Sequence, residues 1–284
     1  MIVAVTGAAG LLGKQVLEAL SAVGLGCFGV DLPGRGAGRD ADLADPDAAR
    51  AALDGADALV HAAAIPRPGA VPPDRLLAIN VGATWSVLAA AESLGIRRVV
   101  HASSFSVYGL PFSPAPVPLR YLPLDEDHPV LPQEAYGLSK WLSEEVVEAW
   151  VQRSGGAAVS LRMPWLQSPA TFPVEVGPRS RTPESRLDLW AYLDLRDAAA
   201  AVLASLRTME GRDLAGRHLR LLLSAADTDS SEETRELAAC GWPQVPLAGS
   251  LGDRDALLSI RRAQREIGFR PRHGWRDYTQ SPET

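Results

Sequence analysis

The amino-terminal segment restricts the fold more than any other part of the sequence. An apolar run, Met1–Thr6, leads directly into Gly7, Gly10 and Gly13, and these glycines open a segment with apolar residues at helical spacing, Leu11–Val23. Glycines at this spacing permit a tight turn and close packing of helix on strand, while the first helical turn presents unpaired N–H groups and a partial positive charge. The segment predicts a strand, a phosphate-binding turn and a helix, although an ordinary glycine turn would share part of this pattern.

Short apolar runs alternate with longer helical patterns through about residue 160. Strands that alternate with helices imply right-handed crossovers between parallel neighbours, so the predicted fold class is α/β, a Rossmann-like doubly wound parallel sheet. After the first unit, we expect strands at Gly26–Val30, Ala58–Ala62, Arg97–His101 and Ala158–Leu161, and helices at Asp47–Leu53, Arg75–Leu94 and Glu134–Arg153.

Composition and charge argue against several classes of protein. A formal net charge of -6 disfavours a general nucleic-acid partner. Cys27 and Cys240 lack metal-ligand spacing, so we expect no metal site, and two cysteines fit a reducing compartment. The amino terminus lacks the charged region of a signal peptide, and no apolar run reaches the roughly 18 to 20 residues that a membrane helix needs. We therefore expect a cytoplasmic protein with no membrane partner.

The end of the second expected strand carries a carboxylate, Asp31. An acidic residue there can accept hydrogen bonds from the adenosine ribose hydroxyls of a dinucleotide, and it would repel a 2′-phosphate. This favours NAD over NADP as the cofactor, although Arg35 is close enough to pair with the extra phosphate. The alternative is that Asp31 is a turn residue before Pro33 and Gly34.

Two further segments fit a dinucleotide site. Asp42 and Leu43 lie where a third strand edge would meet an adenine, and a carboxylate there can accept from the adenine amino group. The small residues Ala62, Ala63 and Ala64 end the next strand and would let a cofactor approach the backbone. His61, which precedes them, is expected to be structural rather than catalytic.

Tyr136 and Lys140 lie four residues apart at the start of a long expected helix, so they project from one face. A phenol with a pKa near 10 is a poor base at neutral pH. An ammonium about 4 Å away would stabilise the phenolate by about 4 kcal/mol at an effective dielectric constant of about 20. That is roughly three pKa units, so the spacing predicts a tyrosine acid/base. Lys14 and Lys140 are the only lysines, so a lysine-rich background does not explain this pair.

A serine-rich segment, residues 102–109, follows the Arg97–His101 strand at the edge where parallel sheets bind ligands. Ser104 could orient a substrate hydroxyl or carbonyl towards Tyr136, although such a segment is often only a turn. The next segment, 109–133, holds seven prolines and is expected to be an ordered loop or lid.

With these residues in view, the chain resembles the extended short-chain dehydrogenase/reductases, also called the NAD-dependent epimerase/dehydratase family. The resemblance implies that Tyr136 is the acid/base, that Lys140 lowers its pKa and holds the nicotinamide ribose, and that Ser104 binds the reacting oxygen. It also implies a supporting role for Asn80 and a homodimer formed through the two long helices. The matching segments follow in order along the chain: 6–13, Asp31, 42–43, 61–64, 80–81, 103–109, 136–140, 192–198 and 262–269.

Together the residues and the resemblance give a complete expected site. The predicted catalytic residues are Ser104, Tyr136, Lys140 and Asn80, and the predicted substrate contacts are Ser104, Ser106, Tyr136, Trp165 and Arg186. The predicted cofactor contacts are Gly7, Ala9, Gly10, Leu11, Leu12, Gly13, Asp31, Asp42, Leu43, Ala62, Ala63, Ala64, Asn80, Tyr136 and Lys140. We expect an NAD-binding Rossmann domain at 1–163 and a smaller substrate lobe at 164–284, part of which, within 190–225, returns to the sheet.

The sequence departs from the family pattern at two places. Phe105 and Ser106 stand where family dehydratases usually carry acidic residues, which disfavours dehydration and leaves dehydrogenation and epimerisation. Trp165 replaces an asparagine that helps to bind the substrate, often a nucleotide sugar, and the lobe is short. These departures favour a smaller substrate, as in the similar uronate or aldose dehydrogenases. The arginines that could still clamp a diphosphate are Arg179, Arg181, Arg186 and Arg262.

Three functions remain open from the sequence. The first is an NAD-dependent dehydrogenase or epimerase acting at a secondary hydroxyl or carbonyl carbon of a sugar, sugar acid or nucleotide sugar. The second is a reductase or dehydrogenase of a non-sugar carbonyl, with the proline-rich loop and Trp165 shaping an apolar pocket. The third is a non-catalytic cofactor-sensing protein, which we would expect to have lost Ser104, Tyr136 or Lys140.

Overall fold

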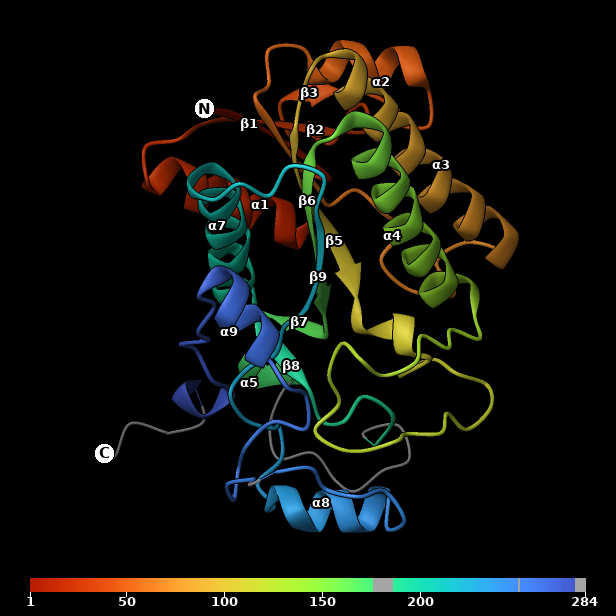
Figure 1. Ribbon diagram of the computed structural model, residues 1–284, viewed down its shortest axis with the longest axis vertical. Coiled ribbons are helices and arrows are strands. Elements are labelled where there is room, and N and C mark those ends of the chain that lie inside the picture. Colours follow the sequence, from red (N-terminus) through yellow and green to blue (C-terminus); the bar gives the residue numbers. More distant parts are fainter. Residues whose placement is uncertain (176–185, 250, 279–284) are drawn as a thin grey trace.

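A parallel sheet of seven strands forms the centre of the computed structural model, which describes residues 1–175, 186–249 and 251–278 (Figure 1). Its strand order is β3-β2-β1-β4-β5-β6-β9, so the chain moves outward from β1 to one edge and then returns to fill the other. The strands are β1 (Ile2–Thr6), β2 (Gly26–Asp31), β3 (Arg39–Asp40), β4 (Ala58–His61), β5 (Arg98–Ser104), β6 (Ala157–Met163) and β9 (His218–Leu222). The predicted Rossmann-like α/β fold is confirmed.

Helices cover both faces of the sheet. On one face α1 (Leu11–Ala22) lies beside α7 (Leu195–Gly211), and on the other α2 (Pro46–Leu53), α3 (Pro73–Ser93) and α4 (Ala135–Ser154) lie in sequence (Figure 1). Asp45 caps α2 and Glu134 caps α4 with carboxylate oxygens that accept first-turn N–H groups. These caps explain why the two helices begin where they do.

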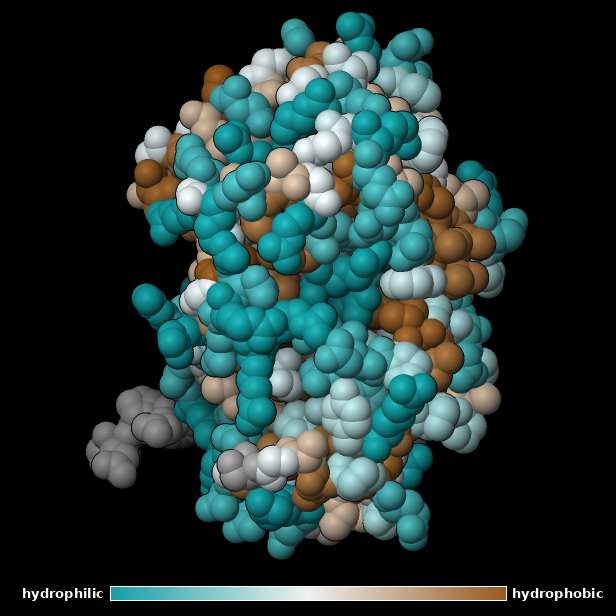
Figure 2. Space-filling model, viewed as in Figure 1, coloured by the Kyte–Doolittle hydropathy of each residue, from teal (hydrophilic) through white to brown (hydrophobic). Residues whose placement is uncertain are grey.

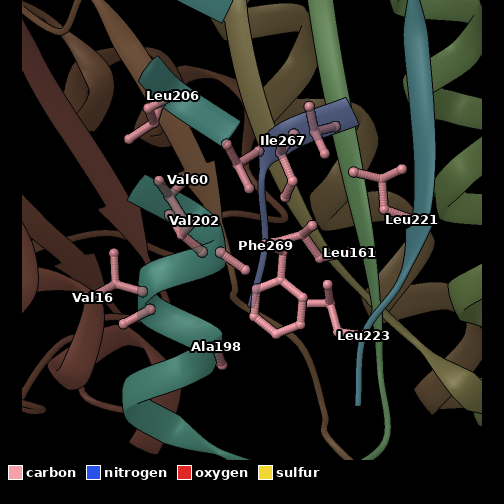
Figure 3. Close-up of a cluster of buried hydrophobic side chains, with 14 of the residues drawn as sticks. Val16, Val60, Leu161, Ala198, Val202, Leu206, Leu221, Leu223, Ile267 and Phe269 are labelled. Atoms are coloured by element: carbon pink, nitrogen blue, oxygen red, sulfur yellow. The ribbon is translucent and has the colours of Figure 1, made fainter. Parts of the chain in front are cut away.

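The apolar core on the α1 and α7 side is continuous across the sheet. Figure 3 shows Val16, Val202 and Leu206 of the helices facing Val60, Leu161 and Leu221 of the strands, with Ile267 and Phe269 filling the space between them. Residues from beyond position 163 therefore complete the core of the sheet layer. The structure places α7 and β9, which carry the Leu195–Leu206 and Leu219–Leu223 segments, in that layer.

The rest of the carboxyl-terminal part packs below the carboxyl ends of the strands. It contains a two-stranded parallel pair, β7 (Trp165–Gln167) and β8 (Tyr192–Asp194), and the short helices α5 (Phe172–Glu175), α8 (Thr234–Gly241), α9 (Arg261–Ile267) and η2 (Trp275–Tyr278). The proline-rich segment 109–133 runs along this part as an ordered loop, as predicted. Its Leu122 and Leu124 form isolated bridges with Leu247 and Leu258.

Two sequence expectations need correction. Strand β5 ends at Ser104 rather than His101, because all seven of its residues pair in register with β6; Ser104 is thus the last strand residue and not part of a following turn. Helix α3 is long and apolar enough to cross a membrane by length and composition, contrary to the expectation that no run is. Its apolar window holds at most two charged residues, and half of that window is buried inside the protein, as in a core helix.

Candidate active site

The turn between β1 and α1 is shaped by its glycines. A Cβ at Gly7 would lie 2.6 Å from the Ala63 nitrogen, and a Cβ at Gly13 would lie 2.2 Å from the Gly7 oxygen. The turn, the end of β4 and the first turn of α1 therefore pack so closely that neither position has room for a side chain. The α1 N-cap, Gly10, makes no side-chain capping bond, and the first helical turn holds no acidic residue. These unpaired N–H groups suit an anionic ligand such as a pyrophosphate.

Asp31 lies at the end of β2 beside this turn. One carboxylate oxygen accepts from the Ala9 nitrogen at 2.8 Å and the other accepts from the Leu32 nitrogen at 2.8 Å. The carboxylate is thus oriented by backbone N–H groups and remains half-exposed at the carboxyl edge of the sheet. This position fits a residue that accepts from ribose hydroxyls.

The other expected cofactor contacts differ in exposure. Leu11 exposes 67% of its surface beside the turn, which leaves apolar area for a ligand to cover, whereas Leu12 is buried in the core. Asp42 is exposed and accepts from the Ala44 nitrogen, whereas Leu43 is buried in the core under α2 and α3.

Ser104 and Tyr136 are brought together by close packing of α4 on the 3-10 turn η1 (Phe105–Tyr108). A Cβ at Gly137 would lie 2.5 Å from the Ser106 oxygen, so the glycine after Tyr136 permits this contact. Ser104 hydrogen bonds to Tyr136, accepts from the Ser106 nitrogen at 3.1 Å and lies 3.1 Å from the Ser106 hydroxyl. The structure thus places Ser104, Ser106 and Tyr136 at one point, at the carboxyl end of β5.

Lys140 lies on the same face of α4, one turn beyond Tyr136. Its Nζ donates to the Ala102 carbonyl at 2.8 Å and lies 6.0 Å from the centre of the Tyr136 ring. Burial lowers the pKa of Lys140 to about 8, against the opposing charge of Glu144. The lysine is therefore anchored to β5 and faces the tyrosine from inside the protein.

The pKa of Tyr136 does not follow the sequence expectation. Burial raises this pKa to about 12, with a hydrogen bond from Ser104 opposing the shift and the charge of Glu134 adding to it. The expectation that Lys140 by itself lowers the pKa of Tyr136 is wrong. The ammonium is held on the Ala102 carbonyl, and desolvation of the phenolate has the larger effect on the pKa. At neutral pH the isolated side chain is a phenol and hence a proton donor.

Asn80 ties three elements together beneath the site. Its Oδ1 accepts from the Ile65 nitrogen at 2.7 Å, and its Nδ2 donates to the Ile65 oxygen at 3.2 Å and to the Ser139 hydroxyl at 3.0 Å. Ser139 in turn donates to the Tyr136 carbonyl at 2.7 Å. Asn80 thus positions the segment after β4 relative to the helix that carries Tyr136 and Lys140.

Comparison with known proteins fixes the family. A sequence profile described as the NAD dependent epimerase/dehydratase family matches residues 3–213.

The chain belongs to this family.

Similar proteins include both dehydrogenases and epimerases. L-arabinose 1-dehydrogenase (NAD(P)(+)) of Haloferax volcanii is 28% identical over 95% of this chain and 96% of that protein. Uronate dehydrogenase of Pseudomonas syringae pv. tomato is 30% identical over 56% of this chain and 57% of that protein. An undecaprenol-linked N-acetylglucosamine 4-epimerase of Escherichia coli O157:H7 is 37% identical, but over only 40% of this chain and 31% of that protein. Several matches thus span well under two thirds of the relative.

Solved structures agree on the fold. A short-chain dehydrogenase/reductase superfamily protein from Agrobacterium tumefaciens with bound NAD has a TM-score of 0.71 and 26% identity, covering 98% of this chain and 94% of that one. A UDP-galactose 4-epimerase has a TM-score of 0.67 and 25% identity, covering 96% and 94%. The resemblance seen in the sequence is confirmed: the protein is an enzyme of the NAD-dependent dehydrogenase and epimerase type.

A buried ion pair below the family site was missed by sequence reasoning. Glu144 of α4 accepts two hydrogen bonds from Arg162 of β6, at 2.9 and 2.7 Å, and a third from the Ser103 hydroxyl at 2.5 Å. Arg162 also donates to the Tyr108 hydroxyl at 2.9 Å. The pair connects β5, β6, η1 and α4 around Ser104. Nothing local in the sequence marks these residues as partners, since they are 18 positions apart.

Buried histidines form a second unexpected feature. His61 hydrogen bonds to the Thr6 hydroxyl at 2.8 Å and to the Thr84 hydroxyl at 3.2 Å, in line with the structural role expected for it. His101 and His218 share the Ser160 hydroxyl at 3.1 and 2.8 Å. Burial lowers the pKa of His61 and of His218 to about 3, with Lys140 adding to the shift at His61 and Arg220 at His218. All these rings are therefore neutral at pH 7.

The substrate contacts expected from the lobe do not gather at one point as Ser104, Ser106 and Tyr136 do. Trp165 begins β7 directly beyond β6 and exposes 37% of its surface. Arg186 donates to the Gly241 carbonyl at 3.3 Å and lies over the Trp242 ring, while Arg262 pairs with Asp127 at 2.6 Å and Glu126 at 3.6 Å. Arg179 and Arg181 lie outside the described residues.

Proposed function

We propose that the protein is an NAD-dependent dehydrogenase that oxidises a hydroxyl-bearing carbon of a free sugar or sugar acid. The observation that carries the proposal is the convergence of Ser104, Tyr136 and Lys140 at the carboxyl end of β5. At the same edge of the sheet lie the glycine turn between β1 and α1, Asp31 and the uncapped start of α1. Together they fit a dinucleotide.

The proposed chemistry divides the work among three side chains. Ser104 holds the substrate oxygen, Tyr136 accepts the hydroxyl proton as the carbonyl forms, and Lys140 stabilises the phenolate and holds the nicotinamide ribose. When bound, NAD supplies the hydride acceptor, and its positively charged nicotinamide favours the phenolate. Asn80 keeps α4 and the segment after β4 in register, so that the reacting groups stay aligned.

The raised pKa of Tyr136 predicts how the rates of oxidation and reduction depend on pH. Oxidation needs the phenolate, so its rate should rise as pH increases above neutral. Reduction needs the phenol, so the reverse rate should fall over the same range. Rates measured in both directions between pH 6 and about pH 10 would test this, and a reverse rate that rises with pH would contradict the role of Tyr136.

Two observations favour a free sugar over a nucleotide sugar. Arg186 and Arg262, which could have clamped a diphosphate, both make contacts within the protein. The L-arabinose 1-dehydrogenase relative matches almost the full length of both chains. The lobe after residue 163, with Trp165 in place of the family asparagine, would then bind a compact substrate.

A substrate panel separates the remaining candidates. Purified protein with NAD is given free aldoses, uronic acids, UDP-sugars and non-sugar secondary alcohols, and NADH absorbance and product identity are followed. We expect NADH to accumulate with an aldose or uronic acid. Interconversion of a UDP-sugar without net NADH would establish an epimerase instead, and turnover of non-sugar alcohols alone would establish the second class. Cofactor binding without any turnover would point to a sensing protein.

The preference for NAD over NADP is assigned to Asp31. Replacement by alanine removes the acceptor for the ribose hydroxyls and the charge that repels a 2′-phosphate. Asp31→Ala should raise the KM for NAD by about tenfold, the effect of roughly 1.4 kcal/mol, and leave the KM for NADP unchanged or lower. Arg35→Ala is the matched control, and an unchanged NAD to NADP ratio in Asp31→Ala would remove Asp31 from the ribose site.

We also propose a homodimer through α3 and α4. Half-buried and exposed apolar residues follow the outer side of both helices, where Figure 2 shows brown side chains gathered, and they include Leu77, Val81, Trp85, Leu142 and Val146. Trp85 exposes 52% of its surface. Trp85→Glu should shift the mass measured by light scattering from dimer to monomer, whereas a wild-type protein that is already monomeric would refute the proposal.

We place the protein in the cytoplasm. Cys27 and Cys240 are free thiols, which suits a reducing compartment, and NAD-dependent oxidation needs an intracellular cofactor pool. Cell fractionation with an antibody against the protein would test this.

A further inference from the structure

Phe112 lies directly beside the proposed acid/base. Its ring centre is 6.1 Å from that of Tyr136, and the two planes meet at 76°, an edge-on contact. The residue comes from the proline-rich loop, 24 positions before Tyr136, and neither motif spacing nor the family resemblance drew attention to it.

The loop holds Phe112 in place from both sides. Leu110 is buried, the Gly109 nitrogen donates to the Ser106 oxygen at 3.0 Å, and Ser113 donates its hydroxyl proton to the Gly109 carbonyl. On the returning leg of the loop, the Leu131 nitrogen donates to the Val107 oxygen at 3.1 Å. The loop is therefore tied to η1, the same turn that positions Ser104.

Burial differs sharply between the two rings. Tyr136 exposes 8% of its surface and Phe112 exposes 44%. A single exposed apolar side chain is common on protein surfaces and by itself has no meaning. An exposed aromatic ring that contacts a buried proton-transfer group differs, because it offers apolar surface next to the place where a substrate would bind.

The distance between Phe112 and Tyr136 limits which part of a substrate Phe112 can contact. The reacting oxygen must come within about 3 Å of the Tyr136 hydroxyl for proton transfer. The carbon ring attached to that oxygen then falls beside Phe112. In a nucleotide sugar, the base is separated from this ring by a diphosphate and a ribose, so it lies too far away to stack here.

We propose that Phe112 is a specificity-determining residue that stacks on the apolar face of a cyclic monosaccharide or sugar acid while Tyr136 and Ser104 hold its reacting hydroxyl. The proposal rests on the proposed sugar dehydrogenase function and adds the part of the protein that recognises the ring. A sugar ring presents axial C–H groups on one face and hydroxyls at its rim. An aromatic wall next to the polar Ser104 and Ser106 pair matches this division.

The test compares three variants with the sugar identified by the panel. Phe112→Ala removes the ring, Phe112→Trp keeps an aromatic surface, and Leu131→Ala removes another exposed apolar side chain, 38% exposed, from the same loop. The KM and kcat for the sugar, the KM for NAD and the pH profile of kcat are measured for each. Thermal melting checks that each variant is folded.

We expect Phe112→Ala to raise the KM for the sugar by roughly 3- to 12-fold, the effect of losing an aromatic contact, with kcat and the KM for NAD changed less than about twofold. Phe112→Trp should stay near wild type, and Leu131→Ala should match wild type.

Each contrary outcome has its own meaning. An unchanged sugar KM in Phe112→Ala, in an enzyme that does oxidise sugars, overturns the stacking role and leaves the proposed function intact. A lower kcat with a displaced pH profile and an unchanged KM shows that Phe112 only packs on Tyr136. A wild-type enzyme that turns over acyclic or non-sugar alcohols alone refutes the proposed function and this inference together.

Discussion

The two faces of the central sheet differ in kind although the same strands supply both. On the face towards α1 and α7, the buried side chains that the strands contribute to the core are apolar, and Figure 3 shows several of them. They include Val3, Val5, Val60, Val100, Val159, Leu161, Leu219 and Leu221.

On the face towards α3 and α4, strands β1, β4, β5 and β6 begin apolar and turn polar near their carboxyl ends. Ala4, Leu59, Val99 and Ala158 form the apolar part. The polar part consists of Thr6, His61, His101, Ser103, Ser160 and Arg162, which bond to one another or to Thr84, Glu144 and His218.

The difference shows how one sheet can be both scaffold and support for a reactive site. Burial of a polar group lowers stability unless the group is hydrogen-bonded. A fully bonded network of buried polar groups holds its members, and the elements that carry them, in fixed positions. Here they lie under α4, the helix that carries Tyr136 and Lys140. The apolar face contributes stability through burial, whereas the polar face fixes positions. Mutations on the apolar face should therefore change stability alone, whereas mutations on the polar face should also change turnover or the pH dependence of stability.

The largest expected effect separates activity from stability. Tyr136→Phe removes only the hydroxyl at the edge of the polar face and should lower turnover by about 10²- to 10⁴-fold, while the melting temperature and NAD binding change little. Steady-state kinetics and thermal melting measure the two properties. Turnover within a few-fold of wild type would refute the acid/base role of Tyr136.

The next effect concerns the buried ion pair. Glu144→Gln leaves the Arg162 charge buried without a counter-charge, since their side chains expose 0% and 3% of their surface. We expect a loss of about 3–5 kcal/mol in the free energy of unfolding, measured by urea denaturation. Glu145→Gln is the matched control, because the neighbouring Glu145 pairs with Arg220 but its side chain is 46% exposed, so its loss should be under about 1 kcal/mol. Equal losses would show that the pair has no special role.

On the apolar face, Leu221→Ala should cost about 2–5 kcal/mol of unfolding free energy through the cavity it leaves. Turnover per folded molecule should stay near the wild-type value, because no hydrogen bond to the site depends on Leu221. A large fall in turnover of the folded Leu221→Ala enzyme would contradict the proposal that the two faces have different roles.

The smallest effect is a pH dependence confined to the polar face. The folded pKa of His218 is about 3, below the ordinary value of 6.5, so the unfolded chain binds more protons below pH 6.5. The stability contributed by the neutral ring is present above pH 6.5 and is lost as pH falls, by up to about 1.4 kcal/mol per pH unit. His218→Gln should flatten the fall in unfolding free energy between pH 6.5 and about pH 5, measured by urea denaturation. A slope equal to that of the wild type would contradict the buried neutral state.

Most of the fold followed from local pattern in the sequence. Helix and strand periods identified the parallel sheet and its long helices, whereas the ends of several elements were misplaced and the short elements β3, β7, β8, α5, α8 and α9 were not predicted. Strand β5 was expected to end at His101 because a serine-rich stretch after a strand is often a turn; pairing with β6 extends the strand to Ser104, and Ser103 donates to Glu144. The pKa of Tyr136 was misjudged for a related reason. Spacing along a helix gives the direction of a side chain, but it gives neither the desolvation of the phenol nor the carbonyl that holds Lys140.

By itself, the sequence determined the sheet, the glycine turn and the Ser104, Tyr136 and Lys140 set, because each depends on residues that are close along the chain or occur in a fixed order. Only the tertiary structure decided which distant side chains meet. It paired Glu144 with Arg162, linked Asn80 to Ser139, and placed Phe112 against Tyr136. Contacts of this kind depend on strand register and loop path, and these are set by the packing of the whole chain.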